Sequence, residues 1–560
     1  MMPNRFKAAR YYLTAAIVLI LLVLNIYVVK TLVIFGSPVL FLFAIFLEIV
    51  LLGVLLYAVI RALATPENIL KSLLVSLWGG LQSNDYIRKL RQSDAPFLAW
   101  TRRRFKRDSP GGLLLTGTVV VAAIPLFSFL SLLLTVVNRG SLTGVDQRIL
   151  NLIPSVRTND ETIFFSIVTV LANVQSIVLL TVAAVIVLWW KHQRPLAVLF
   201  AAAVAAEEAI AFLVKHVVAR TRPESVLSLI EEDSYSFPSG HAVRATVVFG
   251  LLAYLIYKTY RSTPARILTI GLYILTVFLV ALSRVYLGVH YPTDAWGGIL
   301  LGSSLLALLI GALEISSRHE LIKRQKIRLE NRSLMVVPVA VAVFAALASP
   351  LLIHPQTTTV QPSYATLPAL DESTVQKLPI YSETLTGERM EPISFIYAGS
   401  EDQIIGTFKS HGWDQADPST LTNTLRALAV GFQGGQYPDA PVTPSFLNSQ
   451  PEKLAFQQAT ATQSLRQRHH TRLWQTGYAL TDGRPIWVAT ASFDDGIELS
   501  GTVKLPTHHI DPNIDAERSY IINSLGYPTH LLTVTQPELG KNASGDSFFT
   551  DGKAELIYLR

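Results

Sequence analysis

Three short stretches within residues 215–294 decide how this chain folds. Residues 215–223 read KHVVARTRP, residues 238–241 read PSGH, and residues 283–294 read SRVYLGVHYPTD. Among their side chains, three cations, two of the imidazoles and one carboxylate form a set suited to binding a phosphate, attacking it and protonating a leaving group. Apolar segments separate the three stretches, so helices that cross a membrane must bring these side chains together.

The composition indicates a membrane protein of more than one domain. Half of the 560 residues are hydrophobic and 16% are charged. The chain has no cysteine, which excludes disulfides, thiolate catalysis and zinc sites built from cysteine. The net charge of +7 is carried by short basic runs between apolar segments, so we interpret it as a signal of membrane orientation and not of nucleic-acid binding.

Nine apolar segments are close to the roughly 20 residues that cross a bilayer. They lie near residues 12–29, 38–60, 112–136, 164–190, 195–214, 242–257, 267–282, 295–314 and 333–353. Basic residues are concentrated in alternate connections, as is typical of cytoplasmic loops, at 102–107, 191–194, 258–266 and 318–332. By this parity the three stretches and the whole C-terminus lie on the outer side of the membrane.

We therefore predict an all-α polytopic membrane bundle of about nine spans, followed by a soluble α+β domain. The expected parts are a two-span N-terminal extension with a basic cytoplasmic loop (1–111), a membrane core (112–316), a basic loop with the last span (317–353), a linker rich in Thr, Ser and Pro (354–392) and the extracytoplasmic α+β domain (393–560).

Local patterns predict several elements outside the spans. The α+β domain is expected to contain a strand at 393–397, helices at 402–412 and 421–430, and hairpins turning at 482–483 and 551–552. Between the third and fourth spans, residues 145–153 have helical apolar spacing. We expect a short connecting helix there, with a helix lying on the outer membrane surface as the alternative.

Two cations and a helix start form the first half of the candidate site. Lys215 and Arg222 follow the fifth span, and the proline after Arg222 ends that helix at the membrane surface. Ser239 directly precedes the sixth span and is a suitable N-cap, while Gly240 lets the backbone approach a ligand closely. The free N–H groups from Ser239 onward are expected to point outward and bind a phosphate oxygen. His241, in the first turn, is expected to act as general acid.

The second half of the site lies between the seventh and eighth spans. Arg284 ends the seventh span, His290 follows in the loop and Asp294 opens the eighth. The four-residue spacing lets the Asp294 carboxylate hold the imidazole N–H of His290, which fixes the tautomer and leaves the other nitrogen free to attack phosphorus. We predict His290 as nucleophile and Asp294 as its orienting group, with Arg284 binding phosphate oxygens beside Lys215 and Arg222.

The pattern K-x6-R-P, P-S-G-H and S-R-x5-H-x3-D resembles the type 2 phosphatidic acid phosphatase superfamily at every motif position. The resemblance covers about residues 112–316. It implies a six-helix core and hydrolysis of lipid phosphates through a phosphohistidine, without a metal or other cofactor. It also implies, for each matching residue, the catalytic or phosphate-binding role given above.

On this resemblance we expect a lipid phosphatase of a bacterial inner membrane with a periplasmic active site. Undecaprenyl pyrophosphate is the favoured substrate, because its recycling requires an outward-facing pyrophosphatase. Phosphatidic acid, lysophosphatidic acid, phosphatidylglycerol phosphate and lipid A phosphates are alternatives. A vanadium-dependent haloperoxidase shares the fold and the phosphate-site residues, but that family is mostly soluble. A non-enzymatic lipid transporter or secretion accessory is the third alternative.

Acidic residues near the motifs have two interpretations each. Glu208 lies seven residues before Lys215 on the same face of the fifth span, at a depth where charged residues tend to be paired or functional. We expect Glu208 to be a buried partner that tunes the site, with a plain structural ion pair as an equal alternative. The acidic run at 231–233 is interpreted as solvated loop charge, with selection of a lipid headgroup as the alternative.

Residues from about 393 to 530 resemble the LssY C-terminal domain. The resemblance is carried by Ala398–Ser400, Gly412–Trp413, Arg466–His470 with Leu473–Trp474, Thr507–Asp511 and Asp515–Arg518. It supplies no defined activity, so the ligand or partner of this region stays open. The basic run at 466–472 is interpreted as a solvated face or as a surface that recognises a lipid or glycan phosphate.

A cluster in the same region has residue types that bind divalent metals. Its members are His508, His509, Asp511, Asp515 and Glu517. Adjacent histidines on a strand point to opposite faces of the sheet, which argues against both ligating one ion. We therefore favour polar structural contacts over a metal site for this cluster.

Overall fold

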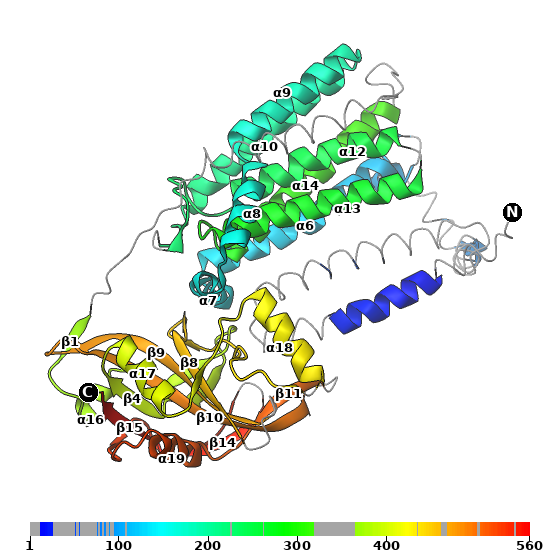
Figure 1. Cartoon of the computed structure of the whole chain (residues 1–560). Helices are drawn as coiled ribbons and strands as arrows, with labels where there is room; N and C mark the ends of the chain where they lie inside the picture. Colours follow the sequence, from blue (N-terminus) through cyan, green and yellow to red (C-terminus); the bar gives the residue numbers. More distant parts are fainter. Residues whose placement is uncertain are drawn as a thin grey trace. The chain divides into compact units, whose positions relative to one another are not determined.

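The computed structural model describes most of the chain in two compact units. The described residues are 12–25, isolated positions between 47 and 89, 95–106, 109–224, 227–260, 262–318, 364–433, 435–460, 467–500, 505–542 and 545–559. One unit holds the long apolar helices, and the other holds the strands together with residues 144–157 (Figure 1). Two predicted spans, 38–60 and 333–353, and nearly all of the basic loop at 318–332 lie outside the described residues, apart from isolated positions.

Five helices of the described residues are long and apolar enough to cross a membrane. They are α6 (Leu113–Val137), α10 (Arg194–Val218), the continuous run of α11 (Gly240–Arg244), η2 (Ala245–Phe249) and α12 (Gly250–Thr259), α13 (Thr263–Tyr286) and α14 (Pro292–Arg318). A sixth span is formed by α8 (Asn159–Val170) and α9 (Val174–Trp190), which are bent by 46°, if the pair is taken as one. The prediction of nine spans is thus not confirmed. Residues 12–25 form a shorter apolar helix.

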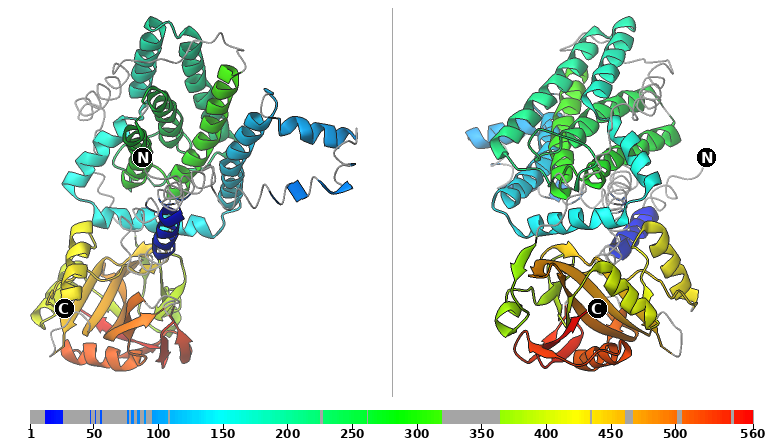
Figure 2. Two further views of the ribbon diagram at one scale, coloured as in Figure 1. Left: turned by 90° about the vertical axis from the view of Figure 1, so that its right-hand side faces the viewer. Right: turned by 60° about the vertical axis from the view of Figure 1, so that its left-hand side comes forward.

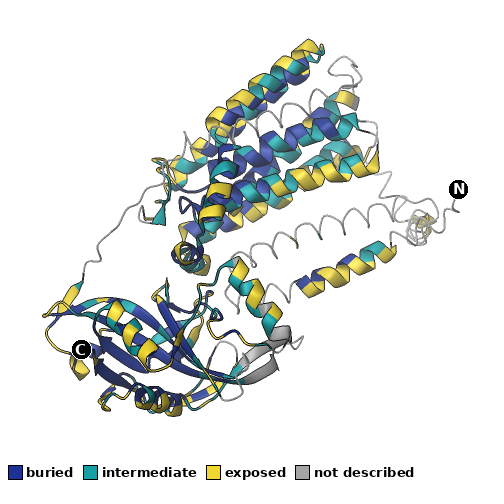
Figure 3. Ribbon diagram, viewed as in Figure 1, coloured by how far each residue is buried: buried dark blue, intermediate teal, exposed yellow. Residues whose placement is uncertain are grey.

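Small residues on α14 let it pack closely against the helix that begins at Gly240. A Cβ added to Gly298 would lie 2.6 Å from Ser239 O, and one added to Gly302 would lie 2.7 Å from Thr246 Cβ. Small residues of this kind allow membrane helices to approach each other closely. The helices run side by side in both views of Figure 2, and Figure 3 shows many exposed residues on them. Many of these exposed residues are apolar. This packing places the PSGH stretch beside the start of α14.

The second unit is built on a mixed sheet. Its strands lie in the order β12 (Leu531–Thr533), β15 (Lys553–Tyr558), β4 (Phe395–Ala398), β10 (Pro485–Ser500), β9 (Arg468–Leu480), β8 (Leu454–Ala459) and β5 (Asp414–Gln415), with β1 (Ala365–Leu367) beside β9 and β11 (Leu505–Ile510) beside β10. Alternate residues of β4 point to opposite faces. Phe395 packs with α17 (Glu401–Ser410) and α19 (Ile514–Ser524), and Ile396 packs in the core on the other face.

The described residues confirm most of the predicted local elements of this unit. The strand at 393–397 is β4, the helices are α17 and α18 (Leu421–Gln433), and β9 and β10 form the hairpin that turns at 482–483. The hairpin predicted at 551–552 is wrong. The strand before it, β14 (Ser547–Thr550), pairs with β13 (Glu538–Lys541), whereas β15 pairs with β4 and β12.

The predicted linker at 354–392 is wrong over its described part. Residues 364–392 contain β1, α16 (Glu372–Val375), β2 (Tyr381–Glu383) and β3 (Arg389–Pro392). Apolar residues at 367, 370, 375 and 378 are buried in the core of the unit. The Thr, Ser and Pro residues of this described part therefore belong to short strands, a short helix and the turns between them, and the folded domain begins by residue 364, not at 393.

A helix between the third and fourth spans belongs to the second unit. Residues 145–153 lie in α7 (Ser141–Val156), which confirms a helix there, and residues 144–157 group with the C-terminal unit. Arg148 Nη2 lies 2.5 Å from Glu383 Oε2, and Asn151 Nδ2 donates to Ser449 O at 2.8 Å. The predicted membrane core at 112–316 is therefore interrupted by a segment that packs with residues more than 200 positions later.

Candidate active site

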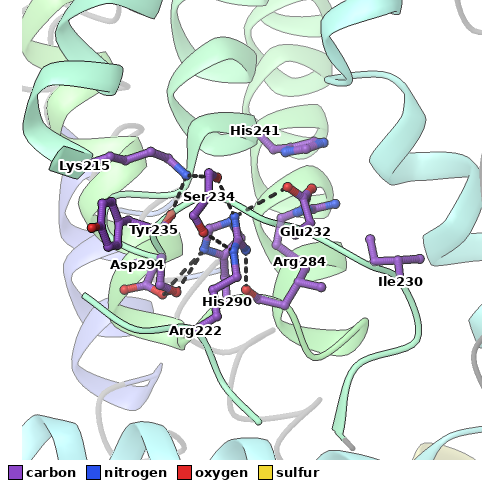
Figure 4. A network of polar contacts seen from close by, with 12 residues as sticks. Lys215, Arg222, Ile230, Glu232, Ser234, Tyr235, His241, Arg284, His290 and Asp294 are labelled. Carbon is purple, nitrogen blue, oxygen red and sulfur yellow. Dashed lines mark hydrogen bonds and ion pairs between the residues drawn. The ribbon is translucent and has the colours of Figure 1, made fainter. Parts of the chain in front are cut away.

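Two cations predicted from the first motif converge on one loop. Lys215 lies in the last turn of α10, and its Nζ donates to Tyr235 O at 2.7 Å and to Ser234 Oγ at 3.1 Å. The helix ends at Val218, before Arg222. Arg222 donates from Nε to Ser234 O at 2.5 Å and from Nη2 to Ser234 Oγ at 2.9 Å. Figure 4 shows both cations directed at this loop.

Glu232 lies between the two arginines of the site. Arg284, 1% exposed at the end of α13, donates from Nη2 to Glu232, and Arg222 Nη2 lies 3.4 Å from the other carboxylate oxygen (Figure 4). Burial alone would raise the pKa of the Glu232 carboxyl, but Arg284 and Arg222 bring it below its usual value. The interpretation of this acidic run as solvated loop charge is therefore wrong for Glu232.

His290 is buried beside the cations. Its Nε2 lies 3.3 Å from Arg222 Nη1, and its Nδ1 lies 3.4 Å from Ser236 Oγ and 3.5 Å from Asp294 Oδ2. Burial, followed by the charges of Arg222 and Arg284, holds the pKa of His290 well below its ordinary value. The imidazole is therefore neutral near pH 7, with Nε2 on the side of the cations and Nδ1 on the side of the carboxylate.

Asp294 is fully buried and is held mainly by residues outside the predicted set. Arg220 Nη1 donates to its Oδ1 at 2.6 Å, Ser236 Oγ donates to its Oδ2, and Tyr291 N donates to Oδ2 at 2.9 Å. The predicted Asp294–His290 contact is present at 3.5 Å, longer than these bonds. Sequence reasoning missed Arg220, although it stands two residues before Arg222 in the first motif, and it missed Ser236, which no pattern marks.

At the helix start at PSGH, a backbone N–H group predicted to be free already makes a hydrogen bond within the protein. Ser239 is the N-cap of α11, but its backbone N–H donates to Asp294 O at 2.9 Å, so the prediction that this N–H is free is wrong. The Ser239 hydroxyl has no hydrogen-bond partner among the described atoms. A Cβ at Gly240 would meet the Arg244 guanidinium at 3.4 Å, an ordinary contact. Packing within the protein therefore does not demand glycine at this position.

His241 stands apart from the network around Arg222. Its ring is 7% exposed, and its Nε2 lies 2.7 Å from Asn173 Oδ1, in the bend between α8 and α9. In Figure 4 the ring lies near Arg284 and Glu232. Sequence reasoning missed Asn173, because the whole segment 164–190 has the apolar composition of one uninterrupted span.

Glu208 does not contact Lys215. Both of its carboxylate oxygens accept hydrogen bonds from Arg244, at 2.7 and 2.6 Å, and its side chain is 47% exposed. The prediction that Glu208 is buried is therefore wrong. Its ion pair is made with Arg244 of α11 and not with Lys215. The neighbouring Glu207 is the buried residue of the two, because α10 turns Ala203, Glu207 and Ala211 toward the interior.

The candidate metal residues of the C-terminal unit lie in separate contacts. His509 Nδ1 lies 2.6 Å from Asp495, Asp515 Oδ1 lies 3.0 Å from Arg518, and Glu517 lies 2.9 Å from His469. Among the described residues, no group of three His, Asp or Glu side chains is placed to hold a metal ion. The side chain of His508 lies outside that description.

The basic run at 466–472 is not a solvated face over its described part. Arg468 is 9% exposed and donates from Nε to Asp494 at 3.1 Å and from Nη1 to Gln457 at 2.6 Å. His470 is 2% exposed. These side chains lie on the face of β9 and β10 that the domain buries.

Two family models match this chain in separate regions. Residues 196–316 match the PAP2 superfamily, and residues 375–554 match the family described as LssY C-terminus. Phosphatidylglycerophosphatase B of Bacillus subtilis (strain 168) is 40% identical over 101 residues, which is 18% of this chain and 49% of that protein. Decaprenylphosphoryl-5-phosphoribose phosphatase of Mycobacterium tuberculosis is 36% identical over 104 residues, 18% of this chain and 52% of that protein.

A third similar protein is the undecaprenyl-diphosphatase of Sulfolobus acidocaldarius, 38% identical over 94 residues, which cover 16% of this chain and 41% of the relative. The chain thus spans about half the length of the curated relatives it matches. A solved structure of a transmembrane PAP2-type phosphatidylglycerolphosphate phosphatase from Bacillus subtilis aligns with a TM-score of 0.33 and 25% identity, covering 37% of this chain and 98% of that one. The membrane region is thus similar to the PAP2 superfamily over residues 196–316, and the region behind it is similar to the LssY C-terminus family over residues 375–554.

Proposed function

We propose that this chain is an integral-membrane phosphatase that cleaves a lipid phosphate or pyrophosphate through a phosphohistidine at His290. The observation that supports this most directly is the convergence of three cations and a neutral, buried imidazole on one loop at the ends of apolar helices. Relatives of the membrane region are named as phosphatases of lipid phosphates. Metal-free phosphoryl transfer needs such a cluster, because the cations must stabilise the charge of the transferring group.

In the binding step, phosphate oxygens replace Glu232 and Ser234 as partners of the cations. Each arginine presents a planar pair of N–H groups that matches two phosphate oxygens. Lys215 adds a third positive charge from α10. The dianionic phosphate competes with a single carboxylate charge, so the exchange favours the ligand once its lipid chain holds it at the membrane.

In the first chemical step, His290 Nε2 attacks phosphorus while Nδ1 keeps its proton, facing Asp294 and Ser236. The new N–P bond forms as the bond between phosphorus and the leaving oxygen breaks. His241, as imidazolium, gives its proton to that oxygen. The lipid alcohol, or the lipid monophosphate if the substrate is a pyrophosphate, departs and leaves a phosphorylated His290.

In the second step, water attacks the phosphorus of this intermediate. His241, now neutral, takes a proton from the water, and the N–P bond breaks to release inorganic phosphate. His241 is then an imidazolium again and His290 a neutral imidazole, so the cycle closes without a further reactant. The same two side chains thus exchange the roles of acid and base.

We favour undecaprenyl pyrophosphate as substrate, with phosphatidylglycerol phosphate as the alternative. The apolar helices let a long lipid chain stay in the bilayer while its phosphate reaches the loops between α10, α11, α13 and α14. One relative is named undecaprenyl-diphosphatase and another phosphatidylglycerophosphatase B. The distribution of basic loops favours an inner-membrane protein whose site and C-terminal domain face the periplasm.

The direct test is phosphate release by the purified chain in detergent, with a panel of lipid phosphates and with EDTA present. His290→Ala should abolish release, and His216→Ala should not, because His216 is exposed next to Lys215. Acid-labile, alkali-stable phosphate on the wild-type protein, absent from His290→Ala, would identify the intermediate. No release from any lipid, or equal release by His290→Ala, would contradict the proposal.

A further inference from the structure

The bend between α8 and α9 brings two side chains onto the candidate site. Thr169, 1% exposed, accepts from Arg284 Nη1 at 2.7 Å, and Asn173 Oδ1 lies 2.7 Å from His241 Nε2. The carbonyl of Ala172, between them, accepts from Arg244 at 3.5 Å. All three positions precede the PAP2-matching residues 196–316 and belong to none of the three motifs. The bend is therefore a fourth element of the site, besides those that carry the motifs.

The conformation of Asn173 indicates what its side chain is used for. Asn173 is the N-cap of α9, with φ −63° and ψ 152°, and asparagine at this position ordinarily accepts a hydrogen bond from a backbone N–H of the first turn. Here the side chain makes no capping bond. Its amide is turned to His241 instead, at the cost of leaving the helix end without this cap.

His241 depends on this contact. Among the described residues, the Asn173 amide is the one hydrogen-bond partner of the His241 ring. A ring held by one bond at Nε2 has its plane and tautomer set by that bond, as is usual for a histidine oriented by a neighbour. With the Nε2 proton donated to the amide oxygen, Nδ1 is the nitrogen left for proton transfer.

We propose that Asn173 is a positioning residue that orients His241 as proton donor to the leaving oxygen. The inference deepens the proposed function and rests on it. The amide oxygen accepts the Nε2–H both in the neutral ring and in the imidazolium, so it holds the ring in place while the Nδ1 proton moves to the leaving oxygen and back from water. Asn173 itself exchanges no proton.

The inference predicts a dependence on the leaving group. Proton donation matters for an alkyl phosphate, whose leaving oxygen is strongly basic, and matters little for p-nitrophenyl phosphate, whose phenolate leaves unaided. Asn173→Ala should lower kcat for a lipid phosphate about tenfold or more, with little change in KM. The first turnover of p-nitrophenyl phosphate should stay within about twofold of wild type, because attack by His290 is unchanged. Asn173→Asp, which keeps an acceptor at the same place, should restore most of the lipid activity.

Two further variants separate positioning from packing. Gln175→Ala changes an exposed residue in the same turn of α9 and should leave both substrates unaffected. Thr169→Val removes the hydroxyl that holds Arg284 and should raise KM for both substrates alike, because it disturbs phosphate binding and not proton donation.

The outcomes separate a failure of the positioning role of Asn173 from a failure of the proposed phosphatase function. Equal loss on both substrates in Asn173→Ala, or no loss on either, would overturn the positioning role. Loss of lipid activity that Asn173→Asp fails to restore would overturn it as well. If wild type releases no phosphate from lipids, or if His290→Ala is fully active, the proposed function itself fails, and that result is read before any Asn173 variant is compared.

Discussion

Charged side chains are arranged differently in the two units of this protein: they gather in one cluster in the membrane unit and form separate pairs in the C-terminal unit. In the membrane unit, Lys215, Arg222 and Arg284 come from separate elements and share the partners Glu232 and Ser234 on one loop. The C-terminal unit has as many charged residues in its motifs, but they pair off locally. Arg468 with Asp494, His469 with Glu517 and His509 with Asp495 are three separate contacts.

This difference shows how a charge cluster that can bind an anion differs from ion pairs that only stabilise the fold. A pair of opposite charges is neutral and complete, so it has no remaining capacity for a ligand. Two arginines that share Glu232, with Lys215 hydrogen-bonded to the same loop, keep a net positive charge, and that charge attracts an anion. The density of charged residues in the sequence is similar in both units, and only the convergence in space distinguishes them.

Asp294→Asn is the substitution expected to weaken the membrane cluster most. The amide keeps the shape of the carboxylate but loses its charge, so the ion pair with Arg220 is lost and His290 loses the group that favours its correct tautomer. We expect kcat for lipid phosphate to fall by about 10²–10⁴. Asp233→Asn, a change of an exposed carboxylate in the nearby loop, is the matched control and should retain activity. A loss below threefold in Asp294→Asn would show that the carboxylate is only structural.

Arg284→Lys tests whether the shared cations bind by geometry or by charge alone. The substitution keeps the positive charge but removes the planar fork that contacts Thr169 and Glu232 together. We expect KM for the lipid phosphate, and the inhibition constant of orthovanadate, to rise about 10-fold to 100-fold. Steady-state kinetics with both ligands would measure this. If neither constant moves, charge alone is sufficient at this position.

Glu232→Gln tests the carboxylate that the cations share. Removing its charge removes the competitor of the phosphate, so inorganic phosphate should inhibit about threefold to tenfold more strongly. The neighbouring Glu231→Gln, on an exposed side chain, should change this constant little. Weaker inhibition by phosphate in Glu232→Gln would mean that the carboxylate serves mainly to hold the arginines in position.

Arg518→Ala tests the charged pairs of the C-terminal unit, where we expect the smallest effect on hydrolysis. Arg518 is 5% exposed, and its guanidinium contacts Asp515 and Asp551. Its loss leaves two half-buried carboxylates without their cation and should cost about 2 kcal/mol of unfolding free energy. Thermal unfolding followed by tryptophan fluorescence reports this, because three tryptophans lie in the core of this unit.

The matched control for that unit is Arg484→Ala, which breaks an exposed pair with Asp482 and should leave the unfolding transition in place. Lipid phosphate hydrolysis should be unchanged in both variants at temperatures below the transition. A fall in hydrolysis with intact folding would show that the charged pairs of the C-terminal unit take part in the reaction after all.

The sequence predicted the parts of the site that lie on regular elements. Apolar length located the helices that carry Lys215, His241 and Arg284, since membrane spans leave a strong compositional signal. The short spacing between His290 and Asp294 predicted that the two side chains lie together, and they lie 3.5 Å apart. Neither inference needed any knowledge of packing between helices.

The residues that the sequence did not reveal are those whose role arises from packing. Asn173 and Thr169 sit at a bend inside an otherwise continuous apolar segment, and Ser236 reaches Asp294 from 58 positions away. Such contacts depend on how helices are placed beside one another, which composition and period do not encode. The linker prediction failed for a related reason, because the strands at 365–367 and 381–383 pair with strands far along the chain.

The grouping of α7 with the C-terminal unit has a consequence for the order of synthesis. Glu383 follows its partner Arg148 by 235 residues, so at roughly 5–20 residues per second the ribosome delivers it about 10 to 50 s later. During that interval α7 has been made without the carboxylate that pairs with Arg148. A chain that ends before residue 364 never receives that partner, and truncation at the domain boundary therefore leaves α7 between two membrane spans without the Arg148–Glu383 ion pair.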